Sequence, residues 1–574
     1  MEETIARRID ERLPHEEEED VHHPFVTEPE EEPGLFQLCT GMKEDLAARI
    51  PLYMNDWGAP KHFFTVFNAT IYAFVIQLIP ALIFAELMAT ETEGNLAVIE
   101  ILLSTAIMGV IYAVFAGQPI VIMGVTGPVA ILLGTSYKLT EQFNAEYFPF
   151  FFWTCLWAGL LHIITAMVGL VSLVWIVTPF TTQIFELFIG LTFVYSAVKE
   201  LVEPIALTQG GLQEDRSQQY ASLIIGLITL WVAWTLHFAE TWSFFTRGTR
   251  VFLTSYNTII AVALGTAFSY LPGVDLSDED QVGIERVNVT APWDWKPTAD
   301  RNWIVHPLEG IDAQGIAAAF VPGLMFFLLF IIDHNVSSIM TQKPKYNLKK
   351  PPAYHWDFFV LGLTFIPCAV LGVPPGNALI PQAPLHVRAL CTRRYLVDDH
   401  GVEREVVIHC EEQRWSGLCQ ALLMFVALVS FEVVSWIPRG CLFGLFLYLG
   451  ICAFYGNEIW ERINLTFMQP SKRPATSIVR NVAWGSVMIY TVIQFVLAFS
   501  VFAIAQFASV GYIYPALLIA LVPIRIYIVS RILSAGDLDY LDPSSESAEE
   551  FVEQQELIEK ALRMELDTSD EDNN

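Results

Sequence analysis

Charge is scarce in this chain of 574 residues, because Asp, Glu, Lys and Arg make up 16% of it, whereas soluble proteins carry about 25%. The eight cysteines form no CxxC pair, so they predict neither a zinc site nor a disulfide framework, and we expect no metal. The nucleotide loop GxxxxGK, the nucleophile motif GxSxG and the metalloprotease motif HExxH are also missing. We therefore expect neither an enzyme nor a cofactor. What the chain has instead is apolar material, 53% hydrophobic and 13% aromatic, which indicates segments that face lipid.

The net charge of -30 is confined to a few stretches. Residues 1–34 hold 13 acidic and 3 basic residues, 537–574 hold 14 and 2, and 273–312 hold 9 and 3. The rest of the chain is nearly balanced, so the charge does not indicate a nucleic-acid partner. The tails 1–60 and 537–574 have the acidic composition typical of solvated segments.

Apolar runs near the roughly 20 residues that cross a bilayer recur along the chain. The clearest are 66–88, 97–116, 148–173, 184–203, 220–239, 252–271, 313–333, 354–373, 416–436, 482–505 and 510–533. With a shorter run near 440–456 and two Gly- and Pro-interrupted runs, 120–138 and 374–390, they give about 14 segments. The sequence thus predicts an all-α polytopic membrane protein.

Seven of these segments fall before the acidic stretch 273–312 and seven after it, which divides the membrane part into 61–272 and 313–536. Pro128 and Pro384 are 256 residues apart, close to the 247 that separate the first segments of the two halves. We infer two repeats, and an odd number of segments in each requires that the second be inverted in the membrane.

Orientation follows from the loops. No apolar run that could serve as a cleaved signal precedes Thr65, so we expect the N-terminus in the cytosol. The stretch 273–312 then lies outside, where the sequon at Asn288 predicts glycosylation, and the lysine-rich loop 342–350 lies inside, as basic loops do. Both termini are predicted to be cytosolic.

The interrupted runs GQPIVIMGVTGP (117–128) and GVPPGNALIPQAPLHVRAL (372–390) predict broken helices. Each fits an extended stretch followed by a helix start, with Thr126 as a cap and Pro128 in the first turn, and with Gln382, Pro384 and His386 in the counterpart. Facing helix N-termini would form a site for one small anion, because they direct free N–H groups at it. The alternative is a pair of ordinary proline kinks.

Asp333 follows the long apolar run FFLLFII. An ionisable side chain at membrane depth is a candidate for a coupling proton or for hydroxyl groups of a substrate. The alternative places Asp333 at a helix end that is already in water, and there His334 reads as a helix-end polar residue. Gln77, in mid-helix before Pro80, is a further candidate for the cavity lining.

Five ordered motifs resemble the bicarbonate-transporter family of anion exchangers. They are EILLSTAIMGVIYAVFAGQPIVIMGVTGP, NLKKPPAYHWDFFVLG, IPQAPLHVRAL, EEQRWSGL and GLFLYLG. Within that family, IIDHNVSS and PPGNALIPQAPLHVRAL are most similar to the borate exporters of plants and fungi. The resemblance implies 14 segments, a core domain (segments 1–4 and 8–11), a gate domain (5–7 and 12–14), a dimer formed by the gate domains, and the plasma membrane.

The resemblance also places Asp333 where anion exchangers carry a functionally important acid. Chloride/bicarbonate exchangers have an Arg at the position of Gln382, and a neutral amide suits a polyhydroxylated solute better. We therefore expect a secondary transporter that exports borate, with Asp333 as the coupling group. The expected substrate-binding residues are Gln77, Gln118, Thr126, Gly127, Pro128, Asp333, Gln382, Ala383 and His386. A bicarbonate/chloride exchanger, or a membrane-anchored scaffold acting through its acidic tails, remains an alternative.

Overall fold

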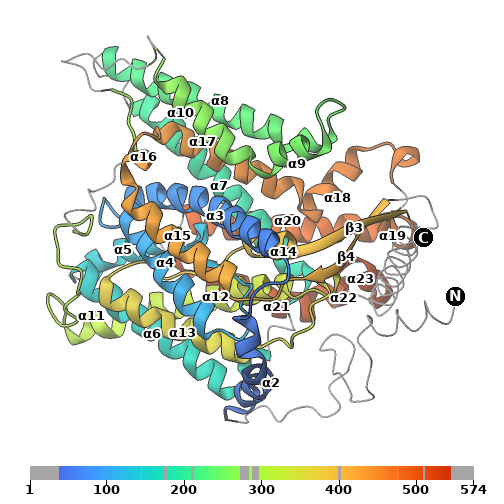
Figure 1. Ribbon diagram of the computed structural model, residues 1–574, viewed down its shortest axis with the longest axis horizontal. Helices are drawn as coiled ribbons and strands as arrows, with labels where there is room; N and C mark the ends of the chain where they lie inside the picture. The colour runs from blue at the N-terminus through green and yellow to red at the C-terminus, as the bar shows by residue number, and fades with distance from the viewer. Residues whose placement is uncertain are drawn as a thin grey trace.

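The computed structural model describes residues 38–143, 145–172, 177–207, 213–271, 274, 283–287, 296–397, 403–474, 476–507 and 511–543. Helices dominate it (Figure 1). The helices of the first half are α2 (Thr40–Asp56), α3 (Phe63–Glu91), α4 (Val98–Phe115), α5 (Gly127–Phe143), α6 (Tyr147–Val168), α7 (Pro179–Leu207), α8 (Gln213–His237), α9 (Arg247–Ser255) and α10 (Asn257–Ser269).

The second half continues with helices and two pairs of strands. Its helices are α11 (Ala313–Ala318), α12 (Phe320–Thr341), α13 (Tyr354–Leu371), α14 (Gln382–Leu390), α15 (Trp415–Val429), α16 (Phe431–Ser435), α17 (Arg439–Tyr455), α18 (Glu458–Phe467), α19 (Ser477–Asn481), α20 (Trp484–Phe507), α21 (Tyr514–Ile524), α22 (Ser530–Ile532) and α23 (Ala535–Leu541). The strands are β1 (Met123–Gly124), β2 (Asn377–Ala378), β3 (Cys391–Val397) and β4 (Glu403–Cys410).

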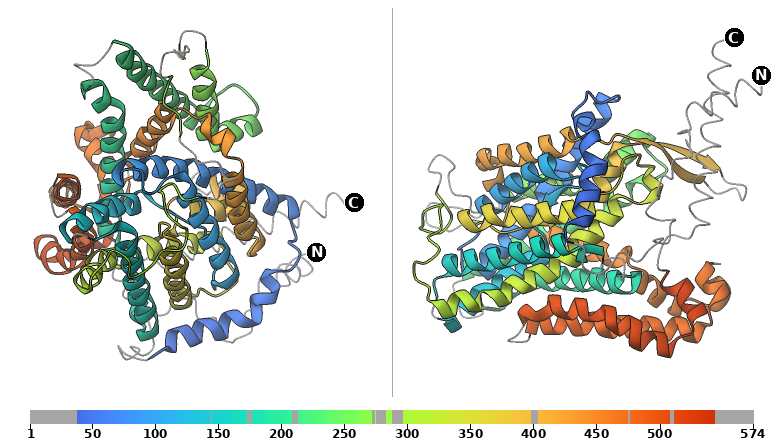
Figure 2. Two further views of the ribbon diagram at one scale, coloured as in Figure 1. Left: turned by 90° about the vertical axis from the view of Figure 1, so that its left-hand side faces the viewer. Right: turned by 90° about the horizontal axis from the view of Figure 1, so that it is seen from below.

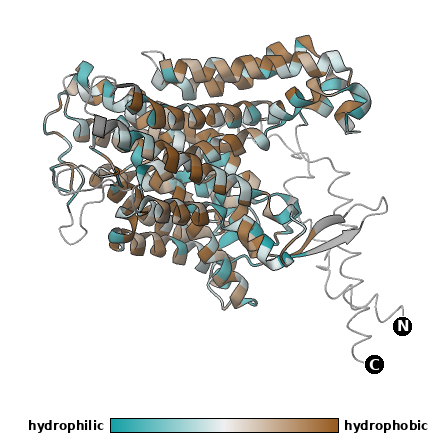
Figure 3. Ribbon diagram, turned by 90° about the horizontal axis from the view of Figure 1, so that it is seen from above, coloured by the Kyte–Doolittle hydropathy of each residue, from teal (hydrophilic) through white to brown (hydrophobic). Residues whose placement is uncertain are grey.

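Eight helices within the described residues are long and apolar enough to cross a membrane. Two bent pairs, α9 with α10 (71°) and α17 with α18 (69°), raise the number to ten if each pair is one span. Helices suit this role because a helix satisfies its own backbone hydrogen bonds in lipid. Figure 3 shows hydrophobic residues along the middle of the helices and hydrophilic ones gathered toward their ends. The chain is an integral, multi-pass membrane protein, and the expected total of 14 segments stays a prediction.

The bundle has two ends. In Figure 1 the hairpin of β3 and β4 lies at the right with α18 and α23, and we call this the hairpin end. Helices α11 and α16 lie at the left, and we call this the α11 end. The same separation is visible from below in Figure 2, where the hairpin stands out beyond the stacked helices.

Two groups of helices pack among themselves. In the first group, α4 packs against α15, α6 against α12 and α13, and α3 against α5, α14 and α15. In the second group, α7 packs against α17 and α20, and α8 against α10 and α17. Glycines permit the closest approaches: a Cβ at Gly159 would lie 2.9 Å from the Gly362 carbonyl oxygen, and one at Gly444 would collide with the Gly226 carbonyl. Small residues serve this purpose in membrane helix pairs.

The interrupted segments are each a short strand followed by a helix. Strands β1 and β2 pair antiparallel, with Met123 opposite Ala378 and Gly124 opposite Asn377. Helix α5 begins at Gly127, shortly after β1 ends at Gly124, and α14 begins at Gln382, shortly after β2 ends at Ala378. All four strand residues are buried. Two helix N-termini therefore meet at one strand pair in the protein interior.

Candidate functional site

The strand pair is built around close backbone contacts. The Leu379 N–H donates to the Ile122 carbonyl at 3.1 Å, which extends the pairing by one bond. A Cβ at Gly376 would collide with the Gly124 carbonyl, and one at Gly124 would lie 2.6 Å from Nε2 of Gln77. A side chain at Gly376 would push the strands apart, whereas one at Gly124 would displace the Gln77 side chain, so the two glycines keep the backbone and Gln77 close together.

Asp333 of α12 lies beside this strand pair. Its side chain is 2% exposed. The oxygen Oδ2 accepts hydrogen bonds from Nδ2 of Asn377 at 2.7 Å and from the Thr126 hydroxyl at 3.4 Å. Asp333 is thus bonded to both interrupted segments, through Thr126 just before α5 and through Asn377 of β2. The burial disagrees with the alternative of a carboxylate at a solvated helix end.

Helix α12 also holds β2 through the residues that follow Asp333. The Ala378 N–H donates to Nδ1 of His334 at 3.2 Å, and the Ser337 hydroxyl donates to the Leu379 carbonyl at 3.0 Å. Since Nδ1 is an acceptor, the His334 ring carries its proton on Nε2, which lies 3.5 Å from the Tyr112 hydroxyl. His334 therefore supports the strand, where the sequence suggested only a helix-end polar residue.

Gln77 of α3 performs the matching task for β1. Its Nε2 donates to the Met123 carbonyl at 2.6 Å, and its Oε1 accepts from Nε2 of Gln420 in α15. Both ends of the Gln77 amide are therefore engaged. Gln420 and Asn377 were missed by the sequence reasoning; Asn377 could have been noticed as a polar residue inside the interrupted motif PPGN.

Two buried amide oxygens near the helix starts lack partners. Oδ1 of Asn377 and Oε1 of Gln382 have no hydrogen-bond partner among the described residues, although both atoms are buried. The Nδ2 of Asn377 is committed to Asp333, so Oδ1 is fixed as the free acceptor. Buried acceptors left unsatisfied are costly, by about 1–3 kcal/mol each. They are suited to a ligand that brings hydroxyl or N–H donors.

The start of α5 is closely packed. A Cβ at Gly127 would collide with the Phe193 ring of α7, and the Pro128 carbonyl accepts a hydrogen bond from the Tyr514 hydroxyl of α21 at 2.8 Å. Thr126 turns its hydroxyl to Asp333, while its carbonyl accepts from the Ala130 N–H at 3.2 Å. On the other segment, Ala383 is fully buried and its N–H donates to the Leu379 carbonyl at 3.0 Å.

Gln118 and His386 are held away from this centre. The Gln118 amide donates to Oε1 of Gln342 at 3.3 Å, and its backbone N–H donates to the Asp357 carboxylate. His386 lies in α14, where Nδ1 meets the Ile120 carbonyl at 2.8 Å and Nε2 meets the Ser416 hydroxyl at 2.9 Å. The structure therefore brings Gln77, Thr126, Gly127, Pro128, Asp333, Gln382 and Ala383 to the strand pair and its helix starts, and gives Gln118 and His386 other contacts. Asn288 lies outside the described residues.

Two cavities lie between the two helix groups, toward the α11 end. One of about 210 Å³ runs beside α5 and is lined by Ile131, Thr135 and Lys138 together with residues of α3, α7 and α20. The other, about 570 Å³, is lined by acidic side chains and by Arg286 and Arg439. Arg439 of α17 bonds Glu86 of α3 at 2.7 Å, so an ion pair joins the two helix groups there.

The chain matches the family described as HCO3- transporter integral membrane domain over residues 37–222 and 208–546. It is 32% identical to Boron transporter 1 of Saccharomyces cerevisiae over 460 residues, which are 79% of this chain and 77% of that protein. It is 26% identical over 603 residues to Probable boron transporter 3 of Arabidopsis thaliana, with 89% of this chain and 81% of that protein covered.

A solved structure has a similar fold. The murine Solute Carrier 26 family member A9 superposes with a TM-score of 0.53 at 11% identity, covering 89% of this chain and 74% of that one. At this identity the likeness concerns the fold alone. The sequence relatives confirm the resemblance that the five motifs indicated. The chain belongs to the bicarbonate-transporter family of membrane transporters.

Proposed function

We propose that this protein is a secondary transporter that exports borate from the cytosol across the plasma membrane. The substrate is held between the starts of α5 and α14, beside the strand pair β1–β2. Asp333 accepts hydrogen bonds from the substrate and takes up or releases the coupling proton. The names of the yeast and Arabidopsis relatives, both boron transporters, support this substrate.

One observation carries the choice of borate: three buried hydrogen-bond acceptors lie next to two helix N-termini. The acceptors are the Asp333 carboxylate, Oδ1 of Asn377 and Oε1 of Gln382. Helix N-termini attract an anion. Acceptors instead require a ligand with donors. Tetrahydroxyborate is an anion with four hydroxyl groups, whereas chloride has no donor and bicarbonate has a single hydroxyl.

Alternating access is supported by the way helices pack in related pairs. The contact of α4 with α15 has a counterpart in α13 with α6, and that of α3 with α14 has one in α12 with α5. In the other group, α8 with α17 corresponds to α20 with α7. These matched contacts support our proposal of two inverted repeats of seven segments each, in which one group of helices moves against the other.

We assign α3–α6 and α12–α15 to the core domain, and α7–α10 and α17–α21 to the gate domain. Exposed apolar side chains on α8 of the gate group, Ile224, Leu227 and Trp231 among them, provide surface for lipid and for a second copy of the chain. We therefore retain the homodimer through the gate domains, with cytosolic tails, as part of the proposal.

The second candidate is a bicarbonate or other small-anion exchanger, which the family description favours. The two candidates differ in what they require of Gln382. A cationic side chain in place of the Gln382 amide would favour an anion that has no hydrogen-bond donors, such as chloride. Borate instead needs Oε1 of Gln382 as an acceptor for its hydroxyl groups. Gln382→Arg should therefore lower borate transport and raise bicarbonate or chloride transport if the present site is built for borate.

The test uses a yeast host that lacks its own boron exporter. Cells that express the wild-type chain should hold less boron and tolerate more of it in the medium. Asp333→Asn should abolish the effect, and Gln382→Leu should weaken apparent affinity about tenfold, as expected for one lost hydrogen bond. Glu203→Gln, at an exposed acid of α7, is the matched control and should leave export unchanged.

Transport measurements with purified protein in liposomes distinguish the two candidate functions. We expect an imposed pH gradient to drive borate transport across the liposome membrane. We expect no transport of labelled chloride or bicarbonate. Chloride or bicarbonate flux with no borate flux would overturn the proposal in favour of the exchanger.

A further inference from the structure

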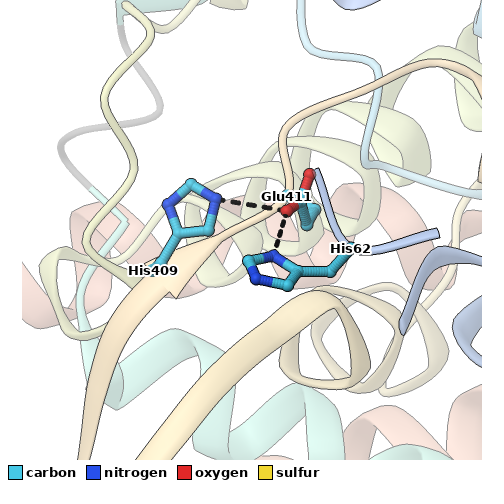
Figure 4. A group of neighbouring side chains, drawn as sticks. All are labelled: His62, His409 and Glu411. Atoms are coloured by element: carbon cyan, nitrogen blue, oxygen red, sulfur yellow. Dashed lines mark hydrogen bonds and ion pairs between the residues drawn. The ribbon is translucent and has the colours of Figure 1, made fainter. Parts of the chain in front are cut away.

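Two histidines and a glutamate converge at the hairpin end, apart from the strand pair. His62 directly precedes α3, His409 lies in β4 and Glu411 follows that strand. Figure 4 shows both imidazole rings directed at one carboxylate oxygen of Glu411. The distances to this oxygen, Oε1, are 2.7 Å from Nδ1 of His62 and 3.4 Å from Nε2 of His409. The three side chains come from positions up to 349 residues apart.

We propose that His62, His409 and Glu411 bind a divalent transition-metal ion of the zinc class, which fastens the start of α3 to the β3–β4 hairpin. Two imidazoles and one carboxylate are a known donor set for zinc, with a water molecule in the fourth position. This site is independent of the transported anion.

The spacing of the donor atoms agrees with one shared ion. Zinc binds imidazole nitrogen and carboxylate oxygen at about 2.0–2.2 Å, so neighbouring donors in a tetrahedral site lie about 3.3 Å apart. Here one potential ligand atom from each side chain lies within 4.8 Å of the other two. The two distances to Oε1 of Glu411, 2.7 Å and 3.4 Å, bracket this tetrahedral spacing.

His409 supplies a second observation. Its Nε2 is buried, yet it has no hydrogen-bond partner among the described residues, because the 3.4 Å contact with Glu411 is poorly directed for a hydrogen bond. A buried ring nitrogen that faces a carboxylate without bonding to it is costly as a free group. A metal ion between the two atoms would satisfy both at once.

Exposure and support also suit a metal site. The Glu411 side chain is 7% exposed, whereas those of His409 and His62 are 37% and 56% exposed, so an ion can enter from the solvent side. The Glu411 N–H donates to the Leu390 carbonyl at 3.2 Å, which fixes the loop that carries the carboxylate. The rigid member of the set is therefore the buried acid, and the histidines can close on the ion.

The position of the site gives the ion a mechanical role. Helix α3 carries Gln77, which holds β1 and is itself held by Gln420 of α15. Glu411 leads into α15, so an ion shared by His62 and Glu411 would connect the near ends of the same two helices. We expect it to stabilise the arrangement of α3, α14 and α15 around the strand pair.

The test uses the full-length protein, purified in detergent, stripped with a chelator and dialysed. Wild-type protein should bind one Zn²⁺ per chain from micromolar solution, with a rise in apparent Tm, and Co²⁺ should give the visible absorption of a tetrahedral site. His409→Ala and His62→Ala should each weaken Zn²⁺ binding at least about 30-fold, which is about 2 kcal/mol. Both histidines are partly exposed, so these variants should still fold, and the loss is measured as Zn²⁺ affinity and as the rise in Tm that Zn²⁺ causes in each variant.

The matched control is His306→Ala, at an exposed histidine of the α11 end, which should bind Zn²⁺ like the wild type. If the wild type binds no Zn²⁺ in the micromolar range, or if His409→Ala and His62→Ala bind as tightly as the control, the three side chains form a plain ion pair and the proposal is wrong.

Discussion

Amide side chains make many of the buried hydrogen bonds around the strand pair β1–β2. Gln77 and Gln420 hold β1, Asn377 bonds Asp333, and Gln382 presents an acceptor at the start of α14. A buried amide costs far less than a buried charge, and it offers both donors and acceptors. Around Asp333, the proposed site is therefore built mainly from amides, whose donors and acceptors point in fixed directions.

A prediction at the same scale concerns Asp45 of α2, outside the membrane-spanning helices. Burial raises the pKa of Asp45 from 3.8 to about 6. The hydrogen bond that Asp45 accepts from the Trp356 N–H at 2.9 Å lowers the pKa and offsets only part of this effect. Because the folded-state pKa is raised, the folded state binds more protons between pH 4 and 6, and stability falls as pH rises through this window. Asp45→Asn should remove this slope and raise apparent Tm at pH 7.

The measurement is thermal unfolding in detergent at pH 4, 5, 6 and 7 for the wild type and the variant. The two curves should converge toward pH 4 and separate above it, with a difference of at most about 3 kcal/mol above pH 6. A variant that is less stable than the wild type at pH 7 would show that the carboxylate is favourable in its charged form.

At the scale of elements, the sequence predicts local features such as apolar helices and interrupted segments. It does not predict which side chains that are distant in sequence contact each other. Apolar runs predicted an apolar helical bundle, and Gly–Pro interruptions predicted the two interrupted segments, whereas the total of 14 spans and the role of Asp333 stay predictions. The pairing of Gln420 with Gln77, 343 residues away, leaves no trace in either segment. The same holds for His386: its place in a half-helix predicted a ligand, whereas tertiary contacts with Ile120 and Ser416 occupy its ring.

Helix α2 gives a prediction about stability. Asp56 at its end is fully buried and pairs with three cations, Lys350 at 2.5 Å, Arg414 at 3.1 Å and Arg49 at 3.2 Å. Asp56→Ala leaves these cations without their acid, and removal of one partner from a buried ion pair costs about 3–5 kcal/mol. Apparent Tm in detergent should fall by several degrees. Glu44→Ala, an exposed acid of the same helix, should not change it.

The strand pair gives a second prediction at this scale. A Cβ at Gly376 would meet the Gly124 carbonyl, which is backbone and cannot rotate away. Gly376→Ala should therefore separate β1 from β2 and abolish boron export in the yeast assay, even where the protein reaches the membrane. Gly485→Ala is the control, since a Cβ there meets no atom within 4 Å. Normal export by the Gly376 variant would mean that the strand pair is not needed for transport.

For the whole molecule, the proposed alternating access depends on the contacts between the two helix groups. The groups are joined toward the α11 end by Arg439 and Glu86, and Tyr514 of α21, which we assign to the gate domain, bonds Pro128 near the proposed site. These bonds cross from one group to the other, whereas the strand pair lies within one group. Motion of the groups against each other would change the contacts between the groups and preserve the pairing of β1 with β2.

The Arg439–Glu86 pair can be tested by a double-mutant cycle. Glu86 is 5% exposed, so Arg439→Gln leaves a buried carboxylate without its partner and should lower both apparent Tm and export. Adding Glu86→Gln should restore part of the loss, with an interaction energy of about 1–3 kcal/mol. Strictly additive effects of the two substitutions would show that the pair does not hold the helix groups together.

The pairing of Met123 with Ala378 also bears on how the protein is made. Ribosomes add about 5–20 residues per second, so the chain from Met123 to Ala378, 255 positions later, takes roughly 13 to 50 seconds to synthesise. During that interval β1 has left the ribosome and its partner strand does not yet exist, although lipid offers its backbone no hydrogen bonds. The first half must therefore wait, shielded by its own helices or by the insertion machinery, and the proposed anion site cannot form until the chain has been made beyond Ala378.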